Sequence, residues 1–207
     1  SLRSGELHGQ GAGWRRRRKR RRRSRGCRRS PLNTVNRTAA VPGVHGGWYV
    51  AACLVTVLAA AVGAMVWPTL PERVPVHWDG TGTADGYEDK SFGSVFFGPL
   101  LSAGLIVFLY LTALVCRRLP LNNPAPAGVD EQVHQQAGMD ATLYFLALTV
   151  VELSLLMAWI SLRGWFLPPD GSVLLFAVPT LGFLAAMGGA GILALRRYRR
   201  LVAELPV

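Results

Sequence analysis

Four long apolar stretches with almost no charge dominate the pattern of hydrophobic and polar positions along the chain. They cover residues 48–67, 92–116, 141–162 and 172–195, and Glu152 is the one acidic or basic residue among them. About 20 apolar residues in a helix cross a hydrocarbon core of about 30 Å. Lipid cannot satisfy free backbone amides, so such stretches favour helices over strands. The pattern therefore predicts an all-α membrane protein, a bundle of four transmembrane helices with a polar extracytoplasmic loop after the first.

The positions of Lys and Arg beside the predicted spans are one-sided. A basic arm precedes the first span, two arginines follow the second at 117–118, and four follow the fourth between 196 and 200. The alternate loops, 68–91 and 163–171, hold only three basic residues. Positively charged flanks are retained on the cytoplasmic side. Both termini are therefore predicted to be cytoplasmic, and residues 119–140 form the predicted cytoplasmic linker, in which one short surface helix is allowed.

The net charge of +11 comes from one end of the chain. Residues 1–37 contain fourteen of the 23 Lys and Arg residues and one of the 12 acidic ones. We expect residues 1–47 to be a basic, disordered cytoplasmic arm or, since the chain begins with Ser1, a translated region upstream of a later start. Residues 48–200 then form the membrane domain, and 201–207 a cytoplasmic tail.

The basic arm indicates a polyanionic partner but no specific nucleic acid. Its arginines have no aromatic residue among them after Trp14 and no base-reading motif. A polybasic segment beside a span attracts anionic lipid headgroups. The expected partners are therefore the lipid bilayer and the anionic headgroups at its surface.

Motifs of enzymes and of cofactor sites are missing from the sequence. There is no Walker loop, no Gly-x-Ser-x-Gly and no His-Glu-x-x-His. Gly80 and Gly82 begin a dinucleotide fingerprint, but position 85, where its third glycine belongs, is Asp. Glu131 and His134 have ligand spacing without a second such pair, and the three cysteines share no common spacing. We predict neither an enzyme nor a cofactor nor a metal site.

The loop between the first two spans carries the most specific pattern. It contains Leu70-Pro-Glu-Arg-Val-Pro-Val-His-Trp78 and then Gly82-Thr-Ala-Asp-Gly-Tyr-Glu-Asp-Lys90. Over about residues 50–105 the chain resembles the SdpI-like bacterial membrane proteins, which share domain of unknown function 1648. The resemblance implies a multi-pass protein of the bacterial inner membrane. It also implies a non-enzymatic role, either immunity against a toxic peptide or signalling through a regulator protein held at the membrane.

This loop is the expected functional face. Its aromatic and hydrogen-bonding side chains are unusual for a connector. We predict contacts with a ligand or partner from the five residues His77, Trp78, Asp85, Tyr87 and Lys90. Asp85 and Lys90 are expected to pair across the turn. The alternative is that the motif only caps the first two helices.

Glu152 offers a second, intramembrane candidate. A carboxyl group in mid-span usually faces a bundle interior or a wet cavity. It could serve a small proton-coupled transporter, the alternative function, or the protein could be an accessory membrane subunit. The structural alternative is a protonated Glu152 that donates to a carbonyl of a neighbouring helix. Thr149 shares its helix face and Ser154 does not.

Small residues at helical spacing predict two close helix contacts. These are Ala52, Thr56, Ala60 and Ala64 in the first span, and Gly182, Ala186 and Ala190 in the fourth.

Overall fold

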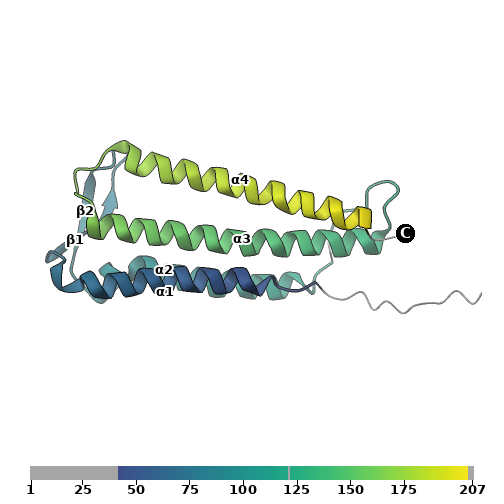
Figure 1. Cartoon of the computed structure of the whole chain (residues 1–207), viewed down its shortest axis with the longest axis horizontal. Helices are drawn as coiled ribbons and strands as arrows, with labels where there is room; N and C mark the ends of the chain where they lie inside the picture. The colour runs from purple at the N-terminus through teal and green to yellow at the C-terminus, as the bar shows by residue number, and fades with distance from the viewer. Residues whose placement is uncertain (1–41, 121, 205–207) are drawn as a thin grey trace, which may run out of the picture. The chain divides into compact units, whose positions relative to one another are not determined.

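The computed structural model describes residues 42–120 and 122–204, which belong to one compact unit. Four helices lie alongside one another in it (Figure 1). They are α1 (Gly46–Val66), α2 (Phe92–Cys116), α3 (Glu131–Phe166) and α4 (Val173–Glu204). All four are long and apolar enough to cross a membrane, which confirms the predicted helical spans. Most of the predicted basic arm, and the last three residues of the predicted tail, lie outside the described residues.

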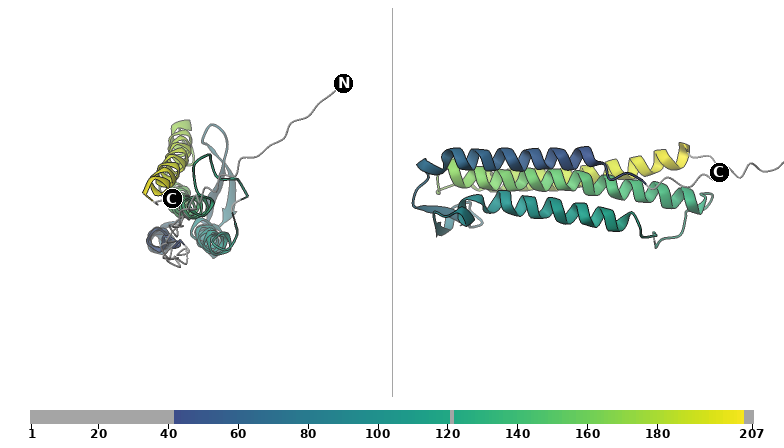
Figure 2. Two further views of the ribbon diagram at one scale, coloured as in Figure 1. Left: turned by 90° about the vertical axis from the view of Figure 1, so that its right-hand side faces the viewer. Right: turned by 90° about the horizontal axis from the view of Figure 1, so that it is seen from below.

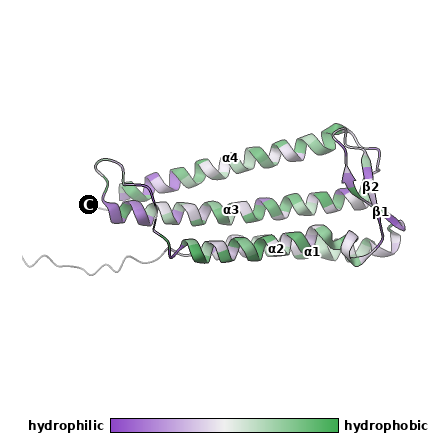
Figure 3. Cartoon of the chain, turned by 180° about the vertical axis from the view of Figure 1, so that it is seen from behind, coloured by the Kyte–Doolittle hydropathy of each residue, from purple (hydrophilic) through white to green (hydrophobic). Residues whose placement is uncertain are grey.

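Two helices are longer than the apolar pattern indicated. α3 begins at Glu131 instead of residue 141, and α4 continues to Glu204 instead of ending near residue 195. The α3 start is set by Asp130, whose carboxylate accepts hydrogen bonds from the backbone N–H groups of the second and third helical residues, at 2.8 and 3.3 Å. Much of the predicted 119–140 linker is therefore helix. Figure 3 shows hydrophilic residues gathered at the start of α3 and near the end of α4, next to the apolar part of the bundle.

A β-hairpin lies between α1 and α2, where the all-α prediction had only a loop. After a short 3₁₀ helix, η1 (Trp67–Thr69), strands β1 (Arg73–Trp78) and β2 (Ala84–Asp89) pair antiparallel, with an irregular register around His77. Proline weakens strand predictions, but both strands of a two-stranded sheet are edges, so Pro75 is tolerated. The short alternation of this segment is too weak to reveal a strand in a sequence of long apolar helices.

α3 is the central helix of the unit. It packs against α1, α2 and α4; α1 and α2 also pack on each other, whereas α4 packs mainly on α3. Figure 2 shows this arrangement end-on. The fully buried side chains of Leu143, Ala147 and Val150 from α3 pack with Ala52 of α1 and Ile106 of α2.

A chain of hydroxyl groups crosses the interior where α1, α2 and α3 meet. The hydroxyls of Thr56 and Ser102 lie 2.7 Å apart, and Ser102 donates to Ser154 at 3.1 Å. All three residues are buried. Side-chain hydrogen bonds between helices stabilise membrane bundles, and these three join all the helices of that junction. Ser154 thus faces away from α4.

The first predicted small-residue contact is partly correct. Ala52 and Thr56 are buried, but the buried face continues through Ala59 and Gly63, and Ala64 is exposed. Repeated steps of four residues drift around a helix with 3.6 residues per turn, so the contact alternates steps of three and four.

The second small-residue contact, on α4, is mostly wrong. Ala190 is buried, whereas Gly182 and Ala186 are exposed. These two residues line a cavity against α3 instead of bringing the helix backbones together.

The two ends of the unit differ, and this allows a test of orientation. The hairpin and the α3–α4 connection lie at one end, and the start of α1 and the end of α4 lie at the other (Figure 1). If the arginine-rich end is cytoplasmic, a reporter active only outside the cytoplasm should work when inserted within 79–83 or 168–171 and fail when fused after Leu201. Activity of the Leu201 fusion would contradict the predicted orientation.

Candidate functional site

The turn of the hairpin is organised by one carboxylate. Asp79 accepts hydrogen bonds from the hydroxyl and N–H of Thr81, at 2.7 and 2.9 Å, and from the N–H of Thr83 at 3.0 Å. These bonds, led by that of the Thr81 hydroxyl, hold the pKa of Asp79 below its usual value. The ionised form therefore stabilises the turn at neutral pH, and this stabilisation is lost only as pH falls through the lowered pKa. Gly82 completes the turn with a φ of 88°.

Arg163 ties this turn to the end of α3. Its Nη2 donates to the carbonyl oxygen of Gly82 at 2.5 Å, and its guanidinium carbon lies 4.7 Å from the centre of the Trp78 ring. Arg163 is only 4% exposed. The N–H of Ala84 also donates to the carbonyl of Pro169, in the α3–α4 connection, at 2.9 Å. The hairpin is thus bound to the bundle far from its own ends, through a residue that the sequence analysis had counted only as a loop charge.

Lys90 secures the base of the hairpin. Its Nζ donates to the carbonyl of Leu70 at 3.0 Å and lies 5.9 Å from the centre of the Trp67 ring. The predicted pair between Lys90 and Asp85 is therefore wrong. The amino group of Lys90 instead bonds the carbonyl of Leu70, in the short segment between η1 and β1. We call residues 67–91 the hairpin cap.

Asp85 has a different partner. Its Oδ1 lies 2.5 Å from Nδ1 of His77, and the two side chains are 49% and 71% exposed. Gly86 faces His77 across the hairpin, and a Cβ at position 86 would lie 2.7 Å from the His77 Cβ. Only glycine leaves room for the imidazole to reach the carboxylate. The result is an exposed pair that can donate and accept hydrogen bonds at the surface.

Tyr87 is the other outward-facing residue of the predicted set. It is 39% exposed, and the Arg73 guanidinium lies 6.0 Å from the centre of its ring while donating to its carbonyl oxygen at 3.4 Å. The five predicted contact residues thus divide into two groups. The three that present their side chains to the surface are His77, Asp85 and Tyr87, and the two that hold the cap in place are Trp78 and Lys90.

Glu152 lies on α3, away from the hairpin cap. Its Oε2 is buried and has no hydrogen-bond partner among the described residues, so the predicted donation to a neighbouring carbonyl is not found. Thr149, predicted to share its face, donates to the sulfur of Met187 on α4 at 3.8 Å. The face that carries Glu152 therefore packs against α4.

The end opposite the cap contains polar contacts that the sequence analysis missed. Asp140 of α3 lies 3.3 Å from Nε2 of His45 and also pairs with Arg197 of α4. His134 and the Tyr198 hydroxyl are 2.9 Å apart. These contacts tie the start of α1 and the end of α4 to α3. In the part of the chain that the structure describes, no three His, Cys, Asp or Glu side chains gather as they would around a metal ion.

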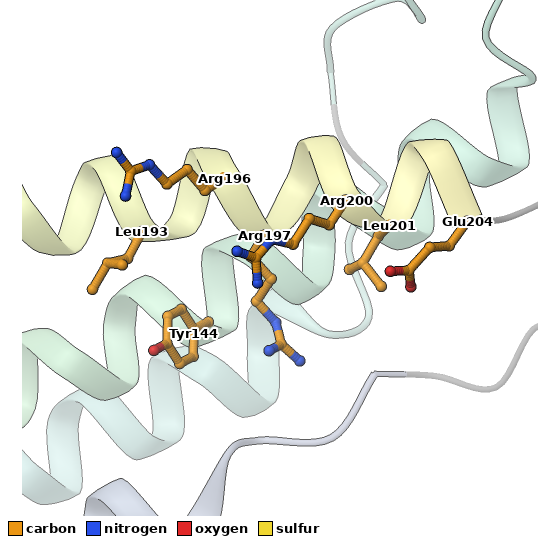
Figure 4. Close-up of a pocket in the computed structure, with 7 residues that line it drawn as sticks. All are labelled: Tyr144, Leu193, Arg196, Arg197, Arg200, Leu201 and Glu204. Carbon is orange, nitrogen blue, oxygen red and sulfur yellow. The ribbon is translucent and has the colours of Figure 1, made fainter.

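A basic pocket lies beside these contacts. Figure 4 shows Arg197 and Arg200 on α4 beside Tyr144 of α3, with Arg196 pointing away from the tyrosine and Glu204 farther along α4. Arg197 also lies with its guanidinium carbon 5.1 Å from the centre of the Tyr144 ring. Arginines in this position fit the cytoplasmic flank predicted for the last span.

Comparison with known proteins gives a match to part of the chain. No curated protein and no solved structure matches the chain. A family does match, over a segment that runs from within α1 through the hairpin cap into α2, as the loop pattern predicted. It is described as a domain of unknown function (DUF1648), and the match covers residues 54–103.

Proposed function

We propose that this is a non-enzymatic, SdpI-like immunity or signalling protein of the bacterial inner membrane, whose hairpin cap binds a secreted peptide. One observation carries the proposal: the cap presents an exposed His77–Asp85 pair and Tyr87 on a hairpin that is itself fixed to the bundle. A surface fixed before binding loses little conformational entropy when a partner docks.

The chemistry of this surface suits a peptide. The imidazole and carboxylate offer a donor and an acceptor for backbone groups, and a tyrosine ring supplies apolar contact with a polar end. The hairpin cap lies on the extracytoplasmic side of the membrane if the arginine-rich flanks are retained in the cytoplasm. There it would meet a secreted peptide before the peptide enters the bilayer.

The test is protection of sensitive cells that express the protein and are challenged with the peptides secreted by the strain that encodes it. Each of His77→Ala, Asp85→Ala and Tyr87→Ala is expected to lower the peptide concentration at half survival by about five- to tenfold, as for residues central to an interface. Membrane abundance must be equal for all variants, measured on immunoblots.

Glu88→Ala is the matched control, because Glu88 is an exposed acid of the same strand whose side chain forms no hydrogen bond or ion pair with the described residues. It should protect as well as the parent. Full protection by all three test variants would show that the cap is only a structural connection between α1 and α2.

A further inference from the structure

A cavity of about 300 Å³ lies between α3 and α4, on the flank of the bundle. Glu152 and Trp159 line it from α3, and Gly182 and Phe183 line it from α4. Its volume is at the lower end of the range for small-molecule sites, about 300–1,000 Å³. The cavity is separate from the hairpin cap, so an inference about it holds whatever the cap binds.

Among the described residues that line the cavity, one is ionisable and none carries a positive charge. Apart from Glu152, every lining residue is apolar or aromatic, and the buried Oε2 of Glu152 has no hydrogen-bond partner among the described residues. A carboxylate in such surroundings is unfavourable unless a positive charge accompanies it. None of the described residues supplies one in this cavity, so an external cation would complete the site.

The lining chemistry selects the kind of cation. Calcium needs six to eight oxygen ligands and magnesium near-octahedral oxygen coordination. This cavity offers a single carboxyl group, so neither metal fits. An organic ammonium needs only one carboxylate, and its apolar groups can lie against aromatic rings, which attract cations through their π faces. Trp159 and Phe183 provide such rings.

Small residues create the space for this ligand. Gly182 has nothing within 4 Å of where a Cβ would lie, and it lines the cavity together with Ala186. α4 packs mainly on α3, so the cavity lies at the border of a two-helix contact rather than inside the α1–α2–α3 core. A hydrophobic molecule dissolved in the bilayer can reach such a site from the side.

We propose that this cavity binds a lipophilic organic cation, with its ammonium group against Glu152 and its apolar part against Trp159 and Phe183.

The experiment uses the full-length protein in an uncharged maltoside detergent and titration calorimetry with benzyltrimethylammonium. Saturable binding to the parent is expected, and benzyldimethylamine N-oxide, of similar size but without net charge, should bind at least about tenfold more weakly. Glu152→Gln keeps the size of the side chain and removes its charge, and it should weaken binding of the cation by a similar factor.

A second variant tests the cavity with the carboxyl group in place. Gly182→Leu should fill the space and abolish binding, whereas Gly189→Leu, on the same helix and equally free of close neighbours but outside the cavity lining, should bind like the parent. Thermal denaturation and gel filtration establish that each variant is folded. If Glu152→Gln does not fold, Gly182→Leu decides the question.

Three results would overturn the proposal. They are an absence of cation binding by the parent, equal binding of the cation and the N-oxide, and undiminished binding of the cation by a folded Glu152→Gln or Gly182→Leu variant. Loss of binding in Gly182→Leu together with undiminished binding in a folded Glu152→Gln would indicate that the cavity holds the apolar part of the ligand without its charge, as for a lipid chain, and would equally reject the cation.

Discussion

Replacing Arg163 by methionine is expected to detach the hairpin cap from the end of α3 while the four helices stay assembled. Methionine keeps much of the length of the side chain but can neither donate to the Gly82 carbonyl nor attract the Trp78 ring. A hydrogen bond from a charged group contributes about 1.5–3 kcal/mol and a cation–π contact about 0.5–2 kcal/mol. Because both interactions share one guanidinium and are not fully additive, the expected loss is about 2–4 kcal/mol of local stability.

Hydrogen exchange measures this loss directly. Because each 1.4 kcal/mol corresponds to about a tenfold change, backbone amides of residues 73–89 should exchange about 30- to 1,000-fold faster in Arg163→Met, and amides in the middle of α3 should be unaffected. Arg200→Met is the matched control, since it removes an arginine from the opposite end of the bundle. Unchanged protection of the hairpin in Arg163→Met would show that the strands and the α3–α4 connection hold the cap without it.

The four helices follow from the sequence because lipid imposes a strong constraint. A segment that crosses a bilayer must satisfy its own backbone groups over about 20 residues, and few soluble sequences mimic that pattern. The ends of the helices are less constrained. Glu131 and Glu204 mark turns that extend into water, where polar residues are compatible with either helix or loop, so hydropathy could not locate these ends.

The sequence predicted where the hairpin cap lies along the chain but not its three-dimensional structure. Its residues are distinctive, yet its shape depends on contacts between distant positions, above all Arg163 with Gly82, which are 81 residues apart. The partner of Asp85 depends on the irregular strand register around His77 and on the absence of a Cβ at Gly86. A hydrophobic pattern specifies neither the strand register nor the space left at Gly86. Spacing along the chain therefore predicted that Asp85 pairs with Lys90 instead of His77.

The small-residue contacts show the same limit. Spacing of four residues correctly identified Ala52 and Thr56, but which neighbouring helix a face meets is decided by the whole bundle. Gly182 and Gly98 have similar sequence surroundings, since both are glycines within apolar helices. The first borders a cavity and the second lies at a tight crossing.

The crossing at Gly98 leads to the largest expected effect on assembly. α2 approaches α3 so closely there that a Cβ on Gly98 would lie 2.9 Å from the backbone carbonyl oxygen of Met157 and would collide with the side chain of Ser161. A backbone oxygen cannot move aside as a flexible side chain can. Gly98→Leu must therefore separate the helices, and overpacking of this kind costs about 1–3 kcal/mol or more.

The measurement is thermal denaturation in detergent, compared with Gly104→Leu. Gly104 is on the same helix and a Cβ there would meet nothing within 4 Å, so its leucine should point into detergent or lipid at little cost. Both substitutions add a leucine side chain to α2, and each removes one glycine that weakens the helix. The two variants therefore differ only in the contact between α2 and α3. Gly98→Leu is expected to melt several degrees below the parent and Gly104→Leu close to it. Equal melting temperatures for the two variants would mean that α2 can move away from α3 at no cost, and that the hydroxyl chain through Ser102 does not depend on this crossing.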